Sequence, residues 1–252
     1  MSGDLVSLRI LVLSASMPER ELMRQGAAAA SVPVDALEAD STASARMQLT
    51  SNDVDVVFVG GSIPIPDCTA FIAGVRTMKA PPFVFLTAAN KAEALGLAAT
   101  GADGAIINPT SLDEAKRLVE RCVHLRLPHR VLVVDDSLTM RSIVRKILVA
   151  SRFKLETSEA EEGIDALKQI SSGKFDLVFL DYNMPGLNGV ETLSEIKRQY
   201  PKLAVVLMTS QAEEELAARA RAAGAAAFLK KPFYPADIDT ILHRIFGLQA
   251  QR

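Results

Sequence analysis

The sequence predicts an α/β fold of two doubly wound units in tandem, each with a parallel sheet of five strands joined by helices. Two observations support this prediction: about half of the chain is repeated, and each copy alternates short apolar runs with segments of helical periodicity. The 252 residues suit two compact domains at about 150 residues per domain. We expect these domains at residues 5–127 and 129–248.

The repeat consists of four strand-like blocks that recur in the same order. The offset between matching blocks grows only from 121 to 123 residues along the chain. The matching blocks are RILVLSAS with RVLVVDDS, VDVVFVGGSIP with FDLVFLDYNMP, FVFLT with VVLMT, and GADGAIINP with GAAAFLKKP. Two copies of one domain explain this conserved order better than a short-repeat solenoid does.

In the second copy, apolar runs predict five strands, and uninterrupted runs are typical of strands that helices cover on both faces. The expected strands are Val131–Val134, Phe153–Thr157, Leu177–Leu180, Ala204–Leu207 and Ala227–Lys230. Ser137 is a good N-cap for a helix with apolar residues at helical spacing, and 236–246 forms the last helix. In the first copy, Ser111 and Glu114 form a capping-box pattern before a helix whose apolar residues should face inward: Leu112, Ala115, Leu118, Val119 and Cys122.

Composition and charge exclude several classes of protein. Hydrophobic residues make up 49% and charged residues 23% of the chain, which is ordinary globular usage. The net charge of −2 provides no basic field for nucleic acid and no polybasic membrane anchor. The chain lacks a secretory signal pattern and an apolar run long enough for a membrane span. We therefore expect a cytoplasmic protein whose two cysteines, Cys68 and Cys122, are reduced.

Carboxylates end two predicted strands of the second copy. Asp135 and Asp136 follow the first strand, and Asp181 ends the third. These strands are neighbours in a doubly wound sheet, so the three carboxylates should meet in one crevice. Like charges at that distance need a cation, and oxygen ligands on a rigid sheet suit Mg²⁺.

A hydroxyl and an ammonium complete this predicted crevice. Thr209 ends the fourth strand and Lys231 follows the fifth. Any one of these residues alone is more simply explained as a cap or loop residue, but their combination describes a phosphate receptor. The Asp181 carboxylate can act as a nucleophile toward phosphorus, while Mg²⁺ and Lys231 neutralise the developing charge.

Four motifs in residues 129–247 resemble those of a CheY-like receiver domain of bacterial two-component signalling: VVDD, LDYNMPGLNG, MTS and FLKKPF. The resemblance implies a flavodoxin-like fold and a phosphoacceptor role for Asp181, supplied by the phosphohistidine of a sensor histidine kinase or a histidine phosphotransfer protein. It also implies direct Mg²⁺ ligation by Asp136, Asp181 and the backbone carbonyl of Asn183, with Asp135 acting mainly through water.

The resemblance implies a switch as well. Thr209 would move to hydrogen-bond a phosphoryl oxygen, and Phe228 would rotate into the space that it leaves. Phosphorylation would then bias a protein-interaction surface between two states. Phe228 considered alone is equally well an ordinary core aromatic.

The first copy lacks this chemistry. At the register of the repeat, Ser14, Ala15, Gly60, Asn108 and Ala105 stand in place of Asp135, Asp136, Asp181, Lys231 and Phe228. We interpret this copy as a degenerate pseudo-receiver that serves as a docking module and could form a homodimer. The alternative is a crevice that binds another anion through the hydroxyls of Ser14, Ser16 and Ser62.

The leading functional hypothesis is a response regulator of a two-component phosphorelay, with no separate output domain expected after Phe246. It is a signalling phosphoacceptor rather than an enzyme, it acts on a downstream protein, and chemotaxis or motility is a reasonable pathway. The alternative roles are a phosphate sink or relay intermediate and, third, a Mg²⁺-dependent phosphohydrolase. Asn183 argues against the phosphohydrolase, because such enzymes need an acidic residue at that position.

Overall fold

A computed structural model describes residues 8–210, 214–246 and 248 of the chain. It divides into two compact units, one up to Leu127 together with the segment from Phe246, and the other Pro128–Ile245. The predicted domain start at residue 5 lies outside the described residues. No helix in the described part of the chain is long and apolar enough to cross a membrane.

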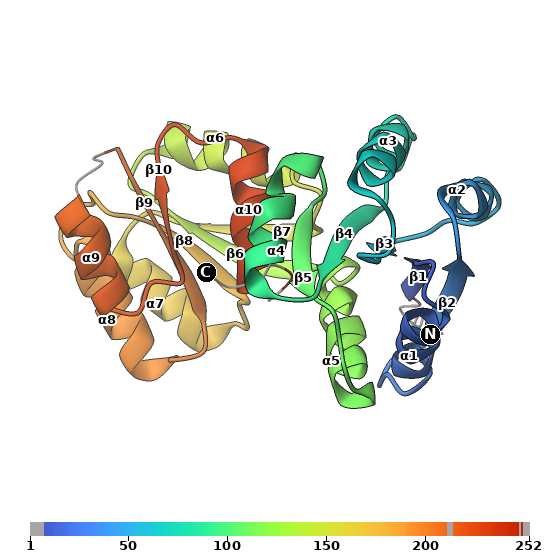
Figure 1. The fold of residues 1–252 in the computed structure, drawn as a ribbon. Coiled ribbons are helices and arrows are strands. Elements are labelled where there is room, and N and C mark those ends of the chain that lie inside the picture. Colours follow the sequence, from blue (N-terminus) through green and yellow to red (C-terminus); the bar gives the residue numbers. More distant parts are fainter. Residues whose placement is uncertain (1–7, 211–213, 247, 249–252) are drawn as a thin grey trace, which may run out of the picture. The chain divides into compact units, whose positions relative to one another are not determined.

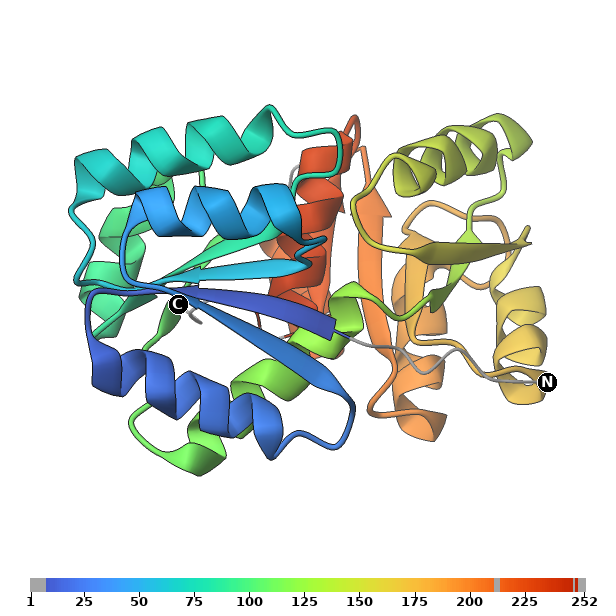
Figure 2. The ribbon, with the colours of Figure 1, turned by 90° about the vertical axis from the view of Figure 1, so that its right-hand side faces the viewer.

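The N-terminal unit is a five-stranded parallel sheet with helices on both faces, and its strand order is β2-β1-β3-β4-β5. Figure 2 shows α1 and α5 on one side of this sheet and α2 and α3 on the other. Its elements are β1 (Leu8–Leu13), α1 (Met17–Ala28), β2 (Val34–Ala39), α2 (Thr42–Ser51), β3 (Val56–Val59), α3 (Ile65–Arg76), β4 (Phe83–Ala88), α4 (Lys91–Gly96), η1 (Leu97–Thr100), β5 (Gly104–Ile107), α5 (Leu112–Cys122) and η2 (Val123–Leu125).

The C-terminal unit repeats this topology with the strand order β7-β6-β8-β9-β10, again entirely parallel. Helices α6 and α10 cover one face of the sheet, and α7, α8 and α9 cover the other (Figure 1). Its elements are β6 (His129–Val134), α6 (Leu138–Val149), β7 (Leu155–Ala160), α7 (Gly163–Ser172), β8 (Leu177–Asp181), α8 (Gly189–Gln199), β9 (Ala204–Thr209), α9 (Glu214–Ala222), β10 (Ala227–Lys230) and α10 (Pro235–Ile245). The predicted fold class, two doubly wound units in tandem, is confirmed.

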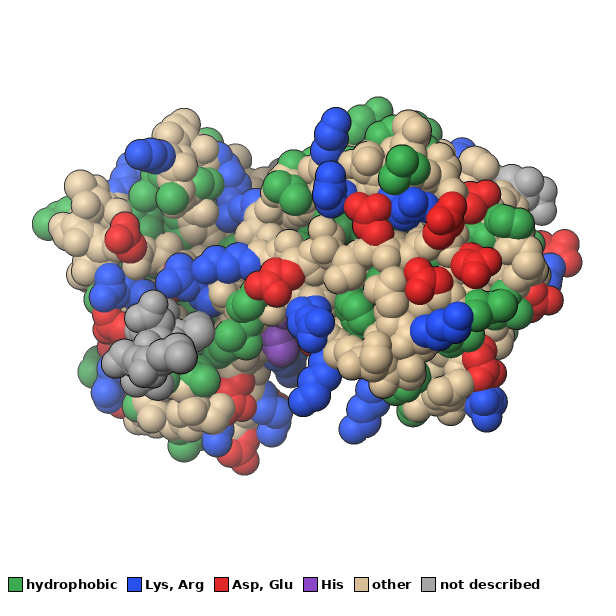
Figure 3. All heavy atoms as spheres, turned by 180° about the vertical axis from the view of Figure 1, so that it is seen from behind, with side chains coloured by type: hydrophobic (Ala, Val, Ile, Leu, Met, Phe, Trp, Pro, Cys, Tyr) green, Lys and Arg blue, Asp and Glu red, His purple; other side chains and the backbone are tan. Residues whose placement is uncertain are grey.

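The central strands form the core of each unit because both of their faces are covered. Every residue of β3 and β8 is buried, and the rings of Phe58 and Phe85 pack in a tilted arrangement in the N-terminal unit. The face of the molecule shown in Figure 3 mixes acidic and basic side chains. Burial on both faces explains why these strands read as uninterrupted apolar runs in the sequence.

Helix starts follow local capping chemistry, with one difference from the sequence prediction. The Ser137 hydroxyl accepts a hydrogen bond from Met140 N, as expected of an N-cap. Ser111 caps α5 in the same way, but the Glu114 carboxylate accepts hydrogen bonds from Thr110 instead of from the backbone of Ser111. The expected capping box is therefore only half formed.

Two further expectations need correction. The second strand of the C-terminal unit begins at Leu155 rather than at Phe153, because its pairing with β6 starts opposite His129. Leu112 is 44% exposed instead of facing inward, because it is the first residue of α5 and precedes the stripe that packs on the sheet.

Candidate functional site

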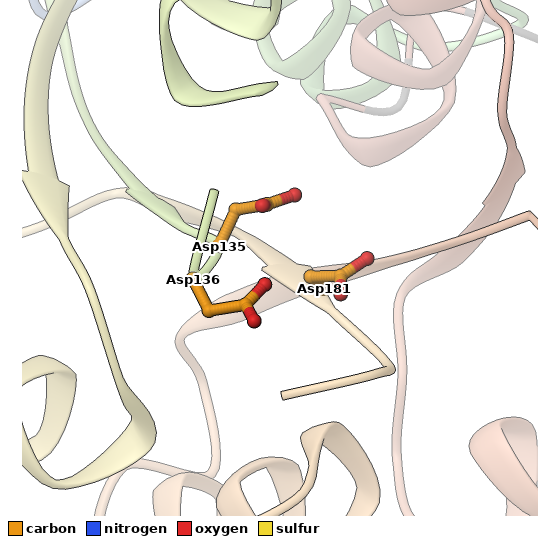
Figure 4. A group of neighbouring side chains, drawn as sticks. All are labelled: Asp135, Asp136 and Asp181. Atoms are coloured by element: carbon orange, nitrogen blue, oxygen red, sulfur yellow. The ribbon is translucent and has the colours of Figure 1, made fainter. Parts of the chain in front are cut away.

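Three carboxylates converge at the carboxyl edge of the C-terminal sheet. Strands β6 and β8 are paired, with Val134 opposite Leu180, so the residues that follow Val134 lie beside Asp181 at the end of β8. One ligand atom from each of Asp135, Asp136 and Asp181 lies within 4.8 Å of the others, and Figure 4 shows the three carboxylates directed into one space. Asp135 and Asp181 are buried, whereas Asp136 is exposed.

The ammonium of Lys231 bridges two of these carboxylates. Its Nζ lies 2.6 Å from Asp135 Oδ2 and 2.8 Å from Asp181 Oδ1. Lys231 follows β10 directly, where its backbone N–H donates to the carbonyl of Thr209, and the Lys231–Pro232 peptide bond is cis. The structure therefore joins the predicted lysine to the carboxylate cluster.

The charges of this cluster are strongly coupled. Burial raises the pKa of the Asp181 carboxyl, and the hydrogen bond from Lys231 opposes that shift without cancelling it. Burial lowers the pKa of Lys231, but its hydrogen bonds with Asp135 and Asp181 outweigh this effect, so the pKa of Lys231 is raised. One ammonium against three carboxylates leaves an excess of negative charge, which fits a divalent cation with oxygen ligands such as Mg²⁺.

Backbone groups orient the two buried carboxylates. Asp135 Oδ1 accepts a hydrogen bond from the N–H of Ser137 at 3.0 Å, and Asp181 Oδ2 accepts one from the N–H of Asn183 at 3.0 Å. Each carboxylate therefore has one oxygen held by the backbone and the other held by Lys231. This arrangement fixes both side chains at the point where the strands end.

The sequence prediction missed a buried arginine that supports the site. Arg141 on α6 donates to the backbone carbonyl of Asp135 at 2.7 Å and pairs with Glu159 on β7 at 3.1 Å. Arg20 and Glu38, their counterparts at the repeat offset of 121 residues, make the same contacts around Ser14. Comparing charged positions between the two copies would have found this pair.

The sequence prediction also missed a close backbone contact beside the site, between Gly189 and the end of β8. A Cβ added at Gly189 would lie 2.3 Å from the carbonyl oxygen of Asp181 and 2.7 Å from Cα of Tyr182. Only glycine fits there, because α8 begins directly against the end of β8. Asn188 and Glu191 form a complete capping box at this helix start, which holds the loop after Asp181 in place.

Thr209 and Phe228 lie at and near the same edge of the sheet. Thr209 is the last residue of β9 and is fully buried, and β9 pairs with β8 so that Asp181 stands opposite Met208. Phe228 lies in β10 opposite Leu207 and is only partly buried. Thr209 therefore lies on the strand next to β8, and Phe228 lies on β10, the edge strand beyond β9.

The equivalent edge of the N-terminal unit is arranged differently. Ser14 Oγ lies 2.6 Å from a carboxylate oxygen of Glu19 and 3.0 Å from Ser62 Oγ. Ser62 Oγ accepts a hydrogen bond from the N–H of Ala15 at 2.9 Å. Two hydroxyls proposed above for binding an external anion are therefore already bonded within the protein. Among the described residues, the group at Asp135, Asp136 and Asp181 is the cluster of side chains that could hold a metal.

Comparison with known proteins identifies the family. A family model described as the response regulator receiver domain matches residues 131–243. Chemotaxis protein CheY-3 of Vibrio cholerae is 37% identical over 119 residues, which are 46% of this chain and 91% of that protein. The chain belongs to the response regulator receiver family. Its receiver domain therefore contains the carboxylate cluster, and the family places the chain in two-component signalling.

Further comparisons cover the receiver domain or the whole chain. Chemotaxis protein CheY of Pseudomonas aeruginosa is 33% identical over 119 residues, which are 46% of this chain and 95% of that protein. A probable two-component system response regulator/GGDEF domain protein of known structure is similar over 96% of this chain and 98% of its own, with 23% identity and a TM-score of 0.52. A second structure described in similar terms covers 95% of this chain and 97% of its own, with 24% identity and a TM-score of 0.52. These two structures show the fold of both units, and the receiver family match lies in the second unit.

Proposed function

We propose that the chain is a response regulator in which Asp181 accepts a phosphoryl group from the phosphohistidine of a sensor kinase or a histidine phosphotransfer protein. The observation that carries this proposal is the position of the Lys231 ammonium between two buried carboxylates, beside the exposed Asp136. A charge cluster of this kind is costly to bury, and clusters of this kind concentrate at functional sites.

The geometry suits in-line transfer to a carboxylate. Asp181 is held by Lys231 on one oxygen and by Asn183 N–H on the other, so its orientation is set before the phosphodonor arrives. A P–O bond forms to Asp181 while the P–N bond of the donor breaks and the histidine nitrogen leaves. Lys231 neutralises negative charge on the transferring group.

The residues of the cluster fit Mg²⁺, which supplies charge neutralisation on the phosphoryl oxygens. Asp136, Asp181 and the backbone carbonyl of Asn183 would bind it directly, and Asp135 would act through water. Lys231 contacts Asp135 and Asp181 but has no hydrogen bond to Asp136, so the exposed carboxylate is the entry point for the cation.

The output of this receiver is a change in a protein-binding surface. Thr209 would turn its hydroxyl to the phosphoryl group, and Phe228, which is only partly buried, would move into the space beside it. The partner is a protein of the signalling pathway, and the similarity to chemotaxis proteins of two bacteria makes chemotaxis the pathway that we propose. A cytoplasmic location follows from that role.

We assign the receiver to residues 129–248 and a pseudo-receiver to residues 5–127. The N-terminal unit has the receiver topology but carries Ser14, Ala15 and Gly60 at the positions of the three acidic residues. It would serve as a docking module, either for the receiver or for a second copy of the chain.

Intact mass after incubation with Mg²⁺ and acetyl phosphate tests this function. We expect one added phosphoryl group on the wild-type chain and none on the Asp181→Asn variant. Asp176→Asn is the matched control, because Asp176 precedes the same strand at its opposite end and its carboxylate accepts from Arg130 N. Addition that survives in Asp181→Asn, or no addition to the wild type, would refute the assignment.

A further inference from the structure

A carboxylate from helix α1 lies at the carboxyl edge of the N-terminal sheet. Glu19 Oε2 lies 2.6 Å from Ser14 Oγ, and Glu19 Oε1 lies 3.0 Å from Asn108 Nδ2. Ser14 and Asn108 hold the positions of Asp135 and Lys231 in the repeat. Glu19 therefore lies between the same two strand ends that the charged cluster joins in the receiver.

Glycine at position 60 makes room for this carboxylate. A Cβ added at Gly60 would lie 2.8 Å from Glu19 Oε2 and 2.7 Å from Ser14 Oγ. Gly60 has the position of Asp181 in the repeat. The Glu19 carboxylate thus fills the space in which the acceptor side chain of a receiver begins.

The hydrogen bonds around Glu19 form an ordered chain that ends on its carboxylate. Because a carboxylate only accepts, Ser14 donates its hydroxyl proton to Glu19, and Ser62 must then donate to Ser14. Ser62 Oγ in turn accepts from the N–H of Ala15, and Ser14 Oγ accepts from the N–H of Ser16. The Ser14 hydroxyl proton, at the end of this chain, therefore depends on the Glu19 carboxylate as its acceptor.

The packing of α1 holds Glu19 in this place. Gly26 of α1 faces Ala115 of α5 so closely that a Cβ on Gly26 would lie 2.7 Å from the Cβ of Ala115. The corresponding positions in the receiver are Ile147 and Ile238, two large side chains. The receiver also carries Met140 where the N-terminal unit carries Glu19. The close helix contact and the inserted carboxylate therefore occur together in one unit.

We propose that the N-terminal unit retains an oxyanion site and that Glu19 is its permanent internal ligand. The two side-chain donors, the Ser14 hydroxyl and the Asn108 amide, are neutral, so the site suits a singly charged carboxylate rather than a phosphoryl dianion. The unit is thus closed to external phosphodonors because its anion position is filled, in addition to its lack of an acceptor.

Chemical rescue tests this proposal on the full chain, without any phosphodonor, so that the result does not depend on phosphoryl transfer at Asp181. Glu19→Ala removes the internal carboxylate, and sodium acetate is added in its place, with sodium chloride at the same ionic strength as reference. We expect acetate to raise the unfolding midpoint of the N-terminal unit by about 3 °C, saturably, and to shift the amide signals of Ala15 and Gly60. Phosphate should give a smaller effect.

Glu21→Ala is the matched control, because Glu21 lies on the same helix and its carboxylate contacts Arg24 and Gln25. We expect no specific response to acetate in this variant or in the wild type. A Glu19→Ala chain that responds to acetate no more than to chloride would overturn the proposal.

A second variant decides the question if Glu19→Ala does not fold. Glu19→Gln keeps the volume of the side chain but has only one acceptor oxygen, so its two terminal atoms cannot accept from both Ser14 and Asn108 as the two carboxylate oxygens do. The amide signals of Ala15 and Ser16 and the side-chain signals of Asn108 should then shift, whereas they should stay unchanged in Glu21→Gln. Unchanged signals in Glu19→Gln would also overturn the proposal.

Discussion

Replacing Lys231 by methionine should destabilise the C-terminal unit markedly when no divalent cation is present. The ammonium compensates Asp135 and Asp181, whose side chains are only 2% and 8% exposed. Two charge-assisted hydrogen bonds at about 1.5–3 kcal/mol each would be lost. The desolvation cost of burying one ammonium would also be removed, which offsets part of that loss. We therefore expect the free energy of unfolding to fall by about 2–4 kcal/mol at pH 7.

The pH dependence of this loss follows from Asp181. Its pKa is already raised by burial, and removal of the Lys231 hydrogen bond raises it further. The loss should be largest above that raised pKa and should shrink as the pH falls through it, because the protonated carboxyl no longer needs a cation. Mg²⁺ should restore part of the stability at neutral pH.

Urea unfolding followed by tyrosine fluorescence measures this effect in the correct unit. The three tyrosines of the chain, Tyr182, Tyr200 and Tyr234, all lie in the C-terminal half, and there is no tryptophan. Lys230→Met is the control, because Lys230 is the adjacent exposed lysine. Equal stability of the Lys231→Met and Lys230→Met variants in EDTA would refute the electrostatic argument.

Three other substitutions test the surroundings of the site. Asp181→Asn should raise the free energy of unfolding at pH 7 by about 1 kcal/mol, because burial raises the pKa of the Asp181 carboxyl. Urea unfolding at lower pH should show this gain disappear as the pH falls toward 3.8, the ordinary pKa of the carboxyl. Gly189→Ala should lower the free energy of unfolding by about 1–3 kcal/mol and slow labelling by acetyl phosphate, because the added Cβ would lie 2.3 Å from the Asp181 carbonyl oxygen. Gly74→Ala is the control and should change neither quantity, because a Cβ at Gly74 meets no atom within 4 Å. Arg141→Met and Arg20→Met should each cost about 1–3 kcal/mol by urea unfolding, but only Arg141→Met should slow labelling.

The fold was predictable because its strongest signals are local and repeated. Buried parallel strands produce apolar runs, and the repeat carries the same order of elements through both halves of the chain. The carboxylate cluster was predictable for a similar reason, since strand order alone brings Asp135 and Asp181 to one edge. Contacts made across elements were harder to predict, as the start of β7 at Leu155 and the exposed side chain of Leu112 show.

Glu19 illustrates what a sequence pattern does not contain. It lies on the first turn of a helix, where an acidic residue is ordinarily explained by the helix dipole. Its contact with Asn108 joins residues 89 positions apart, and the space that it fills exists only because residue 60 has no side chain. The absence of acidic residues at the strand ends was visible in the sequence, whereas the Glu19 carboxylate at this edge became visible only in three dimensions.

The close fit around Gly60 excludes an acceptor side chain from this edge of the N-terminal sheet. A single Gly60→Asp substitution would bring a Cβ within 2.8 Å of Glu19 and within 2.7 Å of Ser14, so the new side chain would collide with its surroundings. A carboxylate at position 60 would require coordinated changes on α1 and at the end of β1, where Glu19 and Ser14 lie. The Gly60→Asp chain would therefore be less stable than its parent, and the present packing excludes an acidic residue at this position as a single change.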